Sequence, residues 1–175
     1  MFLNKTKLFL VISICLVFFF LTYIDVKSQE PKIIYGKAQV VDGDTIKIDK
    51  NKIRLYGIDA PEKKQQCQKI WFSISFLTLN KNYQCGKISS NKLKVKINNK
   101  LIMCKSTNKD RYNRFIAECY KDKININKWM VSNGYAVAYK KYSKKFVAQE
   151  NIAKKEKLGL WAGTFEMPWE WRKKN

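Results

Sequence analysis

Residues 38–62, AQVVDGDTIKIDKNKIRLYGIDAPE, decide the fold because short apolar runs alternate here with strong turn signals. Apolar residues lie on both sides of the turn Asp42-Gly43-Asp44. A second extended run, 53–58, leads into Asp59-Ala60-Pro61-Glu62. Pro61 cannot continue a central strand, and it favours an extended backbone at the residue before it. The segment therefore predicts short strands with polar side chains at their ends.

These strand ends gather three carboxylates and one guanidinium group, those of Asp44, Asp59, Glu62 and Arg54. Such a group is unfavourable unless a cation neutralises the acids and a phosphate engages the arginine. The chain has no histidine, which excludes a histidine base, a Ser-His-Asp triad and any histidine-containing zinc site. A hard cation with oxygen ligands, calcium or magnesium, is then the natural metal.

Three motifs, VVDGDTI at 40–46, RLYGIDAPE at 54–62 and DRYNR at 110–114, have the order and spacing of the thermonuclease (staphylococcal nuclease-like) family. The chain resembles this family from about Gly36 to Arg172. The resemblance implies an α+β, mainly β fold, a five-stranded Greek-key barrel of the oligonucleotide-binding (OB) type with about three helices. It also implies a secreted, calcium-dependent endonuclease that hydrolyses phosphodiester bonds in DNA and RNA and leaves 3′-phosphate ends.

The resemblance also assigns roles to side chains. In the family two aspartates and a main-chain carbonyl bind calcium, a glutamate activates water, and two arginines hold the phosphate. The matching positions here are Asp44 and Asp59 for the metal, the Ala60 backbone carbonyl as a further ligand, Glu62 as the base, and Arg54 and Arg114 for the phosphate.

Purely structural roles compete with these assignments. Asp44 and Asp59 are also typical turn residues, and Arg114 could instead pair with a nearby acid such as Asp110. The family pattern has glycine where this chain has Asn113. Asparagine tolerates a left-handed backbone, so we expect the turn that aims Arg114 to survive.

The charge of the chain favours a polyanionic partner. The formal net charge is +21, and residues 29–175 hold 32 Lys and Arg against 13 Asp and Glu, a net +19. Nucleic acid and an anionic membrane surface both suit such an excess. The resemblance selects DNA and RNA, single-stranded or locally melted, with little sequence selectivity. Candidate contacts are Tyr112, Tyr139, Tyr142, Lys140 and Lys141, although lone tyrosines are more often core or rim residues.

Residues 1–28 have the pattern of a targeting segment, because two lysines precede the apolar run 8–24. A cleaved signal peptide is favoured, and a retained membrane anchor through 8–24 is the alternative. Either way the domain at 29–175 is expected outside the cytoplasm, secreted or periplasmic, or anchored facing outward. No obligate protein partner is predicted.

Four cysteines of the exported domain predict two disulfides, for which three pairings exist. Cys104 and Cys119 flank the turn at 108–113 almost symmetrically, as opposed positions of a hairpin would. We pair these two, and Cys67 with Cys85 by elimination.

Two segments are ambiguous. The apolar run at 69–84 is an insertion relative to the family; it could be a hairpin, a helix or a membrane-facing patch, and we expect it to fold onto its own domain. Residues 86–103 alternate apolar residues with lysines like a strand. The resemblance instead predicts a helix after Cys85 and a strand at about 100–106. Further helices are expected at about 125–133 and 143–157.

Two other functions remain open on the sequence. The first is a non-catalytic nucleic-acid-binding OB-fold protein of the cell envelope. The second is an adhesion or envelope-organising module whose basic charge and 69–84 insertion face lipid.

Overall fold

The computed structural model describes residues 12–15 and 30–175, and residues Pro31–Asn175 form a compact unit of their own. This unit contains both hydrophobic clusters and all the cysteines except Cys15, so it has what a domain needs to fold independently. Most of the expected leader lies outside the described residues. Among those that are described, no helix is long and apolar enough to cross a membrane.

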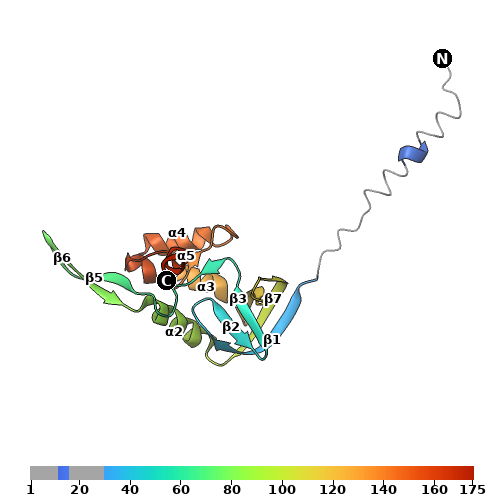
Figure 1. Ribbon diagram of the computed structural model, residues 1–175, viewed down its shortest axis with the longest axis horizontal. Coiled ribbons are helices and arrows are strands. Elements are labelled where there is room, and N and C mark those ends of the chain that lie inside the picture. Colours follow the sequence, from blue (N-terminus) through green and yellow to red (C-terminus); the bar gives the residue numbers. More distant parts are fainter. Residues whose placement is uncertain (1–11, 16–29) are drawn as a thin grey trace, which may run out of the picture. The chain divides into compact units, whose positions relative to one another are not determined.

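The core of the unit is a closed five-stranded barrel, which confirms the predicted fold (Figure 1). The strands run in the order β3-β2-β1-β7-β8, and a parallel pairing of β3 with β8 closes the barrel; all the other barrel pairs are antiparallel. The strands are β1 (Lys32–Val40), β2 (Thr45–Ile48), β3 (Asn51–Leu55), β7 (Leu101–Lys109) and β8 (Phe115–Lys121), with β9 (Ile124–Asn125) as an edge.

Side-chain alternation along the barrel strands explains why they close around one core. Ile46 and Ile48 in β2, and Ile53 and Leu55 in β3, are buried, whereas Lys47 between the first two is exposed. A strand places successive side chains on opposite faces, so this pattern turns one face inward.

The remaining elements cover the barrel and carry the chain back to it. The short strand β4 (Ile58–Asp59) pairs with β10 (Val137–Ala138). The helices are α2 (Cys85–Ile97), α3 (Ile126–Ser132), α4 (Val147–Lys155) and α5 (Pro168–Lys174), with the 3-10 turn η1 (Gly159–Ala162) and β11 (Gly163–Thr164) before the last.

Helix α2 agrees with the family resemblance and contradicts the local strand pattern. Leu93 and Ile97, four residues apart, are buried, whereas Val95 between them is 73% exposed. Leu93 and Ile97 therefore lie on the buried face of one helix, although together with Val95 they also alternate as residues of a strand would. The helix expected at 143–157 is shorter than predicted, since residues before Val147 form turns, and α5 was not predicted.

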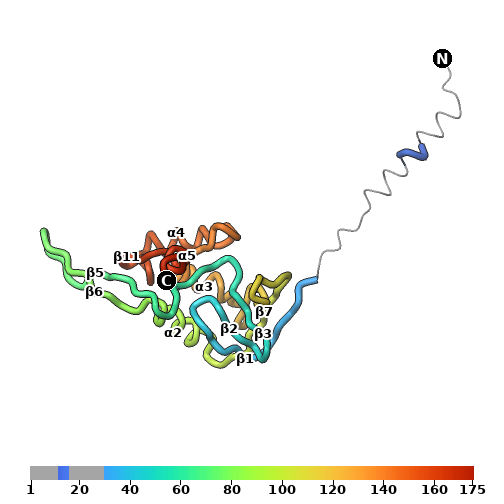
Figure 2. Tube along the Cα trace, viewed as in Figure 1, coloured from blue at the N-terminus to red at the C-terminus, as the bar shows by residue number. Residues whose placement is uncertain are grey.

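The insertion forms a hairpin, β5 (Cys67–Ile74) and β6 (Leu77–Tyr83), which extends away from the barrel (Figures 1 and 2). Its base joins the rest of the fold through the pairing of Gln68 and Lys69 with β11 and through a disulfide of Cys67. The expectation that this segment folds onto its own domain is therefore wrong. Nearly all of its side chains are exposed.

Both expected disulfides are present. Cys104 and Cys119 are register partners in the β7–β8 hairpin, with Cα atoms 4.1 Å apart. Cys67 and Cys85 join the base of the insertion to the start of α2, with Cα atoms 5.6 Å apart. In the chain-entropy account, closing loops of this length stabilises a fold by about 3 kcal/mol each.

Candidate active site

The turn between β1 and β2 places Asp44 at the mouth of the barrel. Its tight path depends on Gly43, because a Cβ at that position would lie 2.1 Å from Ser89 Oγ of α2. Asp42 accepts a hydrogen bond from the Asp44 backbone N–H, which folds the turn on itself. Burial, and to a lesser degree the neighbouring Asp44 carboxylate, raises the pKa of Asp42 to about 6.

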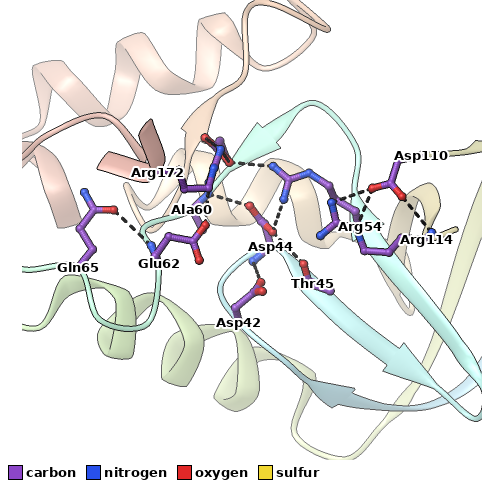
Figure 3. A network of polar contacts seen from close by, with 11 residues as sticks. Asp42, Asp44, Thr45, Arg54, Ala60, Glu62, Gln65, Asp110, Arg114 and Arg172 are labelled. Carbon is purple, nitrogen blue, oxygen red and sulfur yellow. Dashed lines mark hydrogen bonds and ion pairs between the residues drawn. The ribbon is translucent and has the colours of Figure 1, made fainter. Parts of the chain in front are cut away.

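Arg54 on β3 holds the two predicted metal ligands together (Figure 3). Its Nη1 donates to Asp44 Oδ1 at 2.7 Å, and its Nη2 donates to Asp59 Oδ1 at 2.8 Å. The two bonds use two of the five guanidinium donors, so others remain for a phosphate. Burial lowers the pKa of Arg54, but the two carboxylates outweigh it and raise the value overall. Arg54 therefore stays charged.

Both aspartates are buried, and both are held by hydrogen bonds. Asp44 is 4% exposed, and its Oδ2 accepts from the Ala60 backbone N–H at 3.0 Å. Asp59 is fully buried at the end of β4. Burial and the nearby Asp44 carboxylate raise the pKa of Asp59 to about 6, although Arg172 and Arg54 act to lower it. At neutral pH Asp59 is therefore mainly ionised, in spite of its burial.

Arg172 on α5 is a site residue that sequence reasoning missed. Its Nη2 donates to both Asp59 oxygens, at 3.0 and 2.8 Å, and its Nη1 donates to Glu62 Oε1 at 2.9 Å. The family resemblance extends to Arg172, but nothing in the spacing of the tail showed that α5 returns to the barrel mouth. The signal that the sequence offered was an arginine at the end of an aromatic segment. In the structure, Trp169 of that segment stacks on Tyr139, with ring centroids 5.5 Å apart.

Glu62 is held from its backbone side as well. Its N–H donates to Gln65 Oε1 at 3.3 Å, and the buried Gln65 donates in turn to the Glu166 carbonyl at 2.7 Å. Gly86 lets α2 approach this loop, because a Cβ there would lie 1.7 Å from the Glu62 carbonyl oxygen. The loop, α2 and the tail thus fix the backbone of Glu62, while its side chain remains about a third exposed.

Arg114 lies beside Arg54 but is engaged with another acid (Figure 3). It precedes Phe115, the register partner of Ile53 on β3. Its Nε donates to Asp110 Oδ2 at 2.7 Å, which is the competing structural pairing considered above. Burial would raise the pKa of Asp110, but the hydrogen bonds from Arg114 hold it below its usual value. The pair therefore stays charged.

The turn before Arg114 has the expected conformation. Asn113 has φ 61°, and its N–H donates to the Asp110 carbonyl at 2.9 Å. Asparagine therefore takes the left-handed position that glycine has in the family pattern. Tyr112 in this turn is 64% exposed, and the guanidinium carbon of Arg111 lies 4.8 Å from its ring centroid.

The other candidate nucleic-acid contacts are divided between the fold and the surface. Tyr139 is packed between Trp169 and Tyr142, and burial, followed by the charge of Asp59, raises its pKa. Tyr142 is 64% exposed. Lys140 Nζ lies 2.7 Å from the buried carboxylate of Glu150, so its charge also serves the fold. Lys141 is exposed, with its ammonium group 5.9 Å from the Tyr142 ring centroid.

The donor set at the barrel mouth fits a divalent cation by charge and by chemistry. Four carboxylates, those of Asp42, Asp44, Asp59 and Glu62, meet two guanidinium groups, those of Arg54 and Arg172, which leaves a net −2 when all are ionised. Within 12–15 and 30–175, however, no three acidic, cysteine or histidine side chains are grouped as a metal site. A cation bound here would depend on two aspartates, a main-chain carbonyl, water and substrate.

Several known proteins are similar in sequence to this chain. The sequence model of the family described as staphylococcal nuclease homologue matches residues 52–163. A protein of Haemophilus influenzae named an uncharacterized endonuclease is 37% identical over 146 residues, which cover 78% of this chain and 71% of that protein. An uncharacterized endonuclease of Escherichia coli is 34% identical over 148 residues, covering 79% and 85%. Succinoglycan biosynthesis protein ExoI of Rhizobium meliloti is 32% identical over 140 residues, covering 78% and 68%.

Proposed function

This chain belongs to the staphylococcal nuclease family, and from that membership and the network at the barrel mouth we propose that it is a calcium-dependent endonuclease. It hydrolyses phosphodiester bonds of DNA and RNA with little sequence selectivity and leaves 3′-phosphate ends. The observation that supports this most directly is the single hydrogen-bonded network of Asp44, Asp59, Glu62 and two arginines. The two disulfides suit an exported protein, as does the predicted leader.

In this proposal Asp44, Asp59 and the Ala60 carbonyl would hold calcium, and the bound cation would supply positive charge beside the phosphate that is attacked. Glu62 accepts the proton of the attacking water as the general base, which is the role that the family resemblance gives it. Arg54 and Arg114 donate hydrogen bonds to the non-bridging phosphate oxygens. The water oxygen forms a bond to phosphorus while the P–O5′ bond breaks, and the departing 5′ oxygen takes a proton from solvent. The phosphate then stays on the 3′ side of the cut.

The test is digestion of single-stranded DNA by residues 29–175 in calcium or in EDTA. We expect cleavage to fall by at least about a hundredfold when calcium is removed, because the metal supplies several kcal/mol of charge stabilisation. Mass spectrometry should find 3′-phosphate and 5′-hydroxyl ends. Equal cleavage in EDTA would contradict the calcium requirement, and 5′-phosphate ends would contradict the bond assignment. DNA binding without cleavage in either buffer would identify a non-catalytic nucleic-acid-binding barrel.

Arg172 should compete with calcium for the same acids, because its guanidinium bonds both Asp59 and Glu62. We expect Arg172→Met to lower the free energy of unfolding in EDTA by about 1–2 kcal/mol, since buried Asp59 loses one of its two cationic partners. The loss is moderate because Arg172 is a third exposed and Arg54 remains. Calcium affinity should rise by about tenfold, because a competing positive charge is gone.

Urea denaturation in EDTA and across a calcium titration measures both effects. Lys173→Met is the matched control, since its side chain pairs with the exposed Glu170 on the same helix. Weaker calcium binding by the Arg172→Met protein would mean that this arginine supports the metal site and does not compete with it.

A further inference from the structure

The β5–β6 hairpin carries an apolar surface that the nuclease proposal does not use. Residues 70–80, IWFSISFLTLN, contain no charged side chain, and Lys69 and Lys81 bound them. Phe76 at the tip is 91% exposed and Trp71 is 68% exposed. An exposed apolar surface of this kind marks an interaction site.

The register of the hairpin sorts its side chains onto two faces. Phe72 pairs with Leu79, and Ile74 pairs with Leu77, so these four side chains lie on one face. The opposite face carries Ser73, Thr78 and Asn80, with Ile70 as its one apolar member, and Ser73 Oγ lies 3.1 Å from Thr78 Oγ1. The bulge at Trp71 separates this amphipathic tip from the base. We define the apolar face as Phe72, Ile74, Leu77 and Leu79, together with Phe76 at the turn.

Two lysines lie on the same side of the hairpin as the apolar face, at the end nearer the base of the hairpin. Lys69 and Lys81 are register partners, and the alternation of β6 puts Lys81 on the same face as Leu79 and Leu77. Like charges directly opposite one another destabilise a hairpin in water. An anionic partner would remove this penalty, because both ammonium groups could bind it at once.

The chain around the hairpin has the same sign of charge. Residues 63–109 contain 11 lysines and neither aspartate nor glutamate. In the helix that follows the hairpin, Lys87, Lys92 and Lys94 are all exposed. A partner of this region must therefore combine an apolar layer for the tip with negative charge for the lysines.

From this combination we propose that the hairpin docks the domain on an anionic lipid bilayer. The apolar face and Phe76 would enter the boundary of the acyl chains, with Trp71 at the headgroups and Lys69 and Lys81 on anionic headgroups. From Leu79 to Leu77 the strand spans about 7 Å, which lies within the roughly 5–10 Å that an interfacial element enters. Deeper insertion is excluded. From residue 70 toward the tip, β5 and β6 pair only with each other among the described residues, so the backbone groups on their outer edges would have no hydrogen-bonding partner in the hydrocarbon layer.

Nucleic acid is the less suitable partner for this surface. Single-stranded DNA needs aromatic platforms interleaved with cations that follow its backbone. Three of the five side chains of the apolar face are aliphatic, Ile74, Leu77 and Leu79, and no cation occurs between Lys69 and Lys81. The proposal is also independent of catalysis, because the hairpin contributes no residue to the network at the barrel mouth.

Co-sedimentation of residues 29–175 with vesicles tests the proposal without the apolar leader. We expect binding to phosphatidylglycerol vesicles and at least about tenfold weaker binding to phosphatidylcholine vesicles. Phe72→Ser/Phe76→Ser should lower the partition coefficient by about tenfold or more, because each ring buries a large apolar area. The matched control is Tyr35→Ser/Val95→Ser, which removes two exposed apolar side chains elsewhere.

A second pair of variants tests the charge. Lys69→Gln/Lys81→Gln should weaken binding to phosphatidylglycerol vesicles by about tenfold. The control Lys37→Gln/Lys52→Gln removes the same charge from exposed barrel positions and should have a smaller effect. All variants are exposed-site changes, and equal urea midpoints verify that they fold.

Three results would overturn the proposal. The first is equal vesicle binding by the hairpin variants and their controls. The second is a dimer in size-exclusion chromatography that the Phe72→Ser/Phe76→Ser variant loses, which would assign the face to a second copy of the chain. The third is a loss of single-stranded DNA affinity in the same variant with unchanged vesicle binding, which would assign it to nucleic acid.

Discussion

Glu62→Gln is expected to lower kcat on single-stranded DNA by about 10²–10⁴-fold, the usual contribution of a positioned general base. The amide has nearly the same shape, but it cannot accept a proton from water. Its oxygen can still accept the hydrogen bond that Arg172 donates to Glu62, so the loop and tail should keep their places. Initial rates at saturating calcium, with KM determined separately, measure the effect.

Two controls separate proton transfer from the loss of an ion pair. Glu170→Gln removes an exposed carboxylate that pairs with Lys173 on the helix carrying Arg172, and should leave kcat unchanged. Arg172→Met removes the partner of Glu62 while keeping its carboxylate. If Arg172→Met lost as much activity as Glu62→Gln, the pairing of these residues and not proton transfer would explain the loss. An unimpaired Glu62→Gln enzyme would remove Glu62 from the mechanism.

The barrel could be predicted from the sequence because its signals are local. Alternation in β2 and β3, together with the turn at Gly43, defines which side chains face inward and where the strands end. The family motifs placed Asp44 and Arg54 on this frame, and the structure joins them by a 2.7 Å hydrogen bond. The pairing of Cys104 with Cys119 also followed from a local feature, the turn between them.

The features that sequence reasoning missed depend on long-range packing. Arg172 reaches Glu62 across 110 positions, and no periodicity in the tail encodes that contact. Helix α2 was predicted from the family resemblance, although the local pattern favoured a strand. Leu93, Val95 and Ile97 fit a strand period, and only their burial against the barrel reveals which two face inward. The hairpin was left open because an apolar run without charges is equally consistent with a core segment and with an exposed tip.

Arg114→Lys is expected to lower kcat by about 10²–10³-fold, since it removes a preorganised donor from the charge that develops on the phosphate. Lysine keeps the positive charge but loses the planar fork that bonds two oxygens at once. The structure gives this residue a competing role, because Asp110 accepts from both its Nε and its Nη2. Comparing kcat with KM for wild type and the Arg114→Lys variant measures the effect.

The two roles of Arg114 predict different results, which makes the variant decisive. A surface ion pair contributes about 0–1 kcal/mol to stability, so a purely structural Arg114 would change the urea midpoint slightly and leave kcat alone. If Arg114 binds the phosphate, the substitution would lower kcat and leave the urea midpoint almost unchanged.

Arg111→Lys is the control, because Arg111 lies in the same exposed turn and its guanidinium contacts Tyr112. The Asp110 carboxylate accepts from the backbone N–H and the Nε of Arg114 and so orients this arginine. Asp110→Asn should therefore also lower kcat, but by less. An Arg114→Lys enzyme with normal kcat would leave Arg54 as the arginine that holds the phosphate.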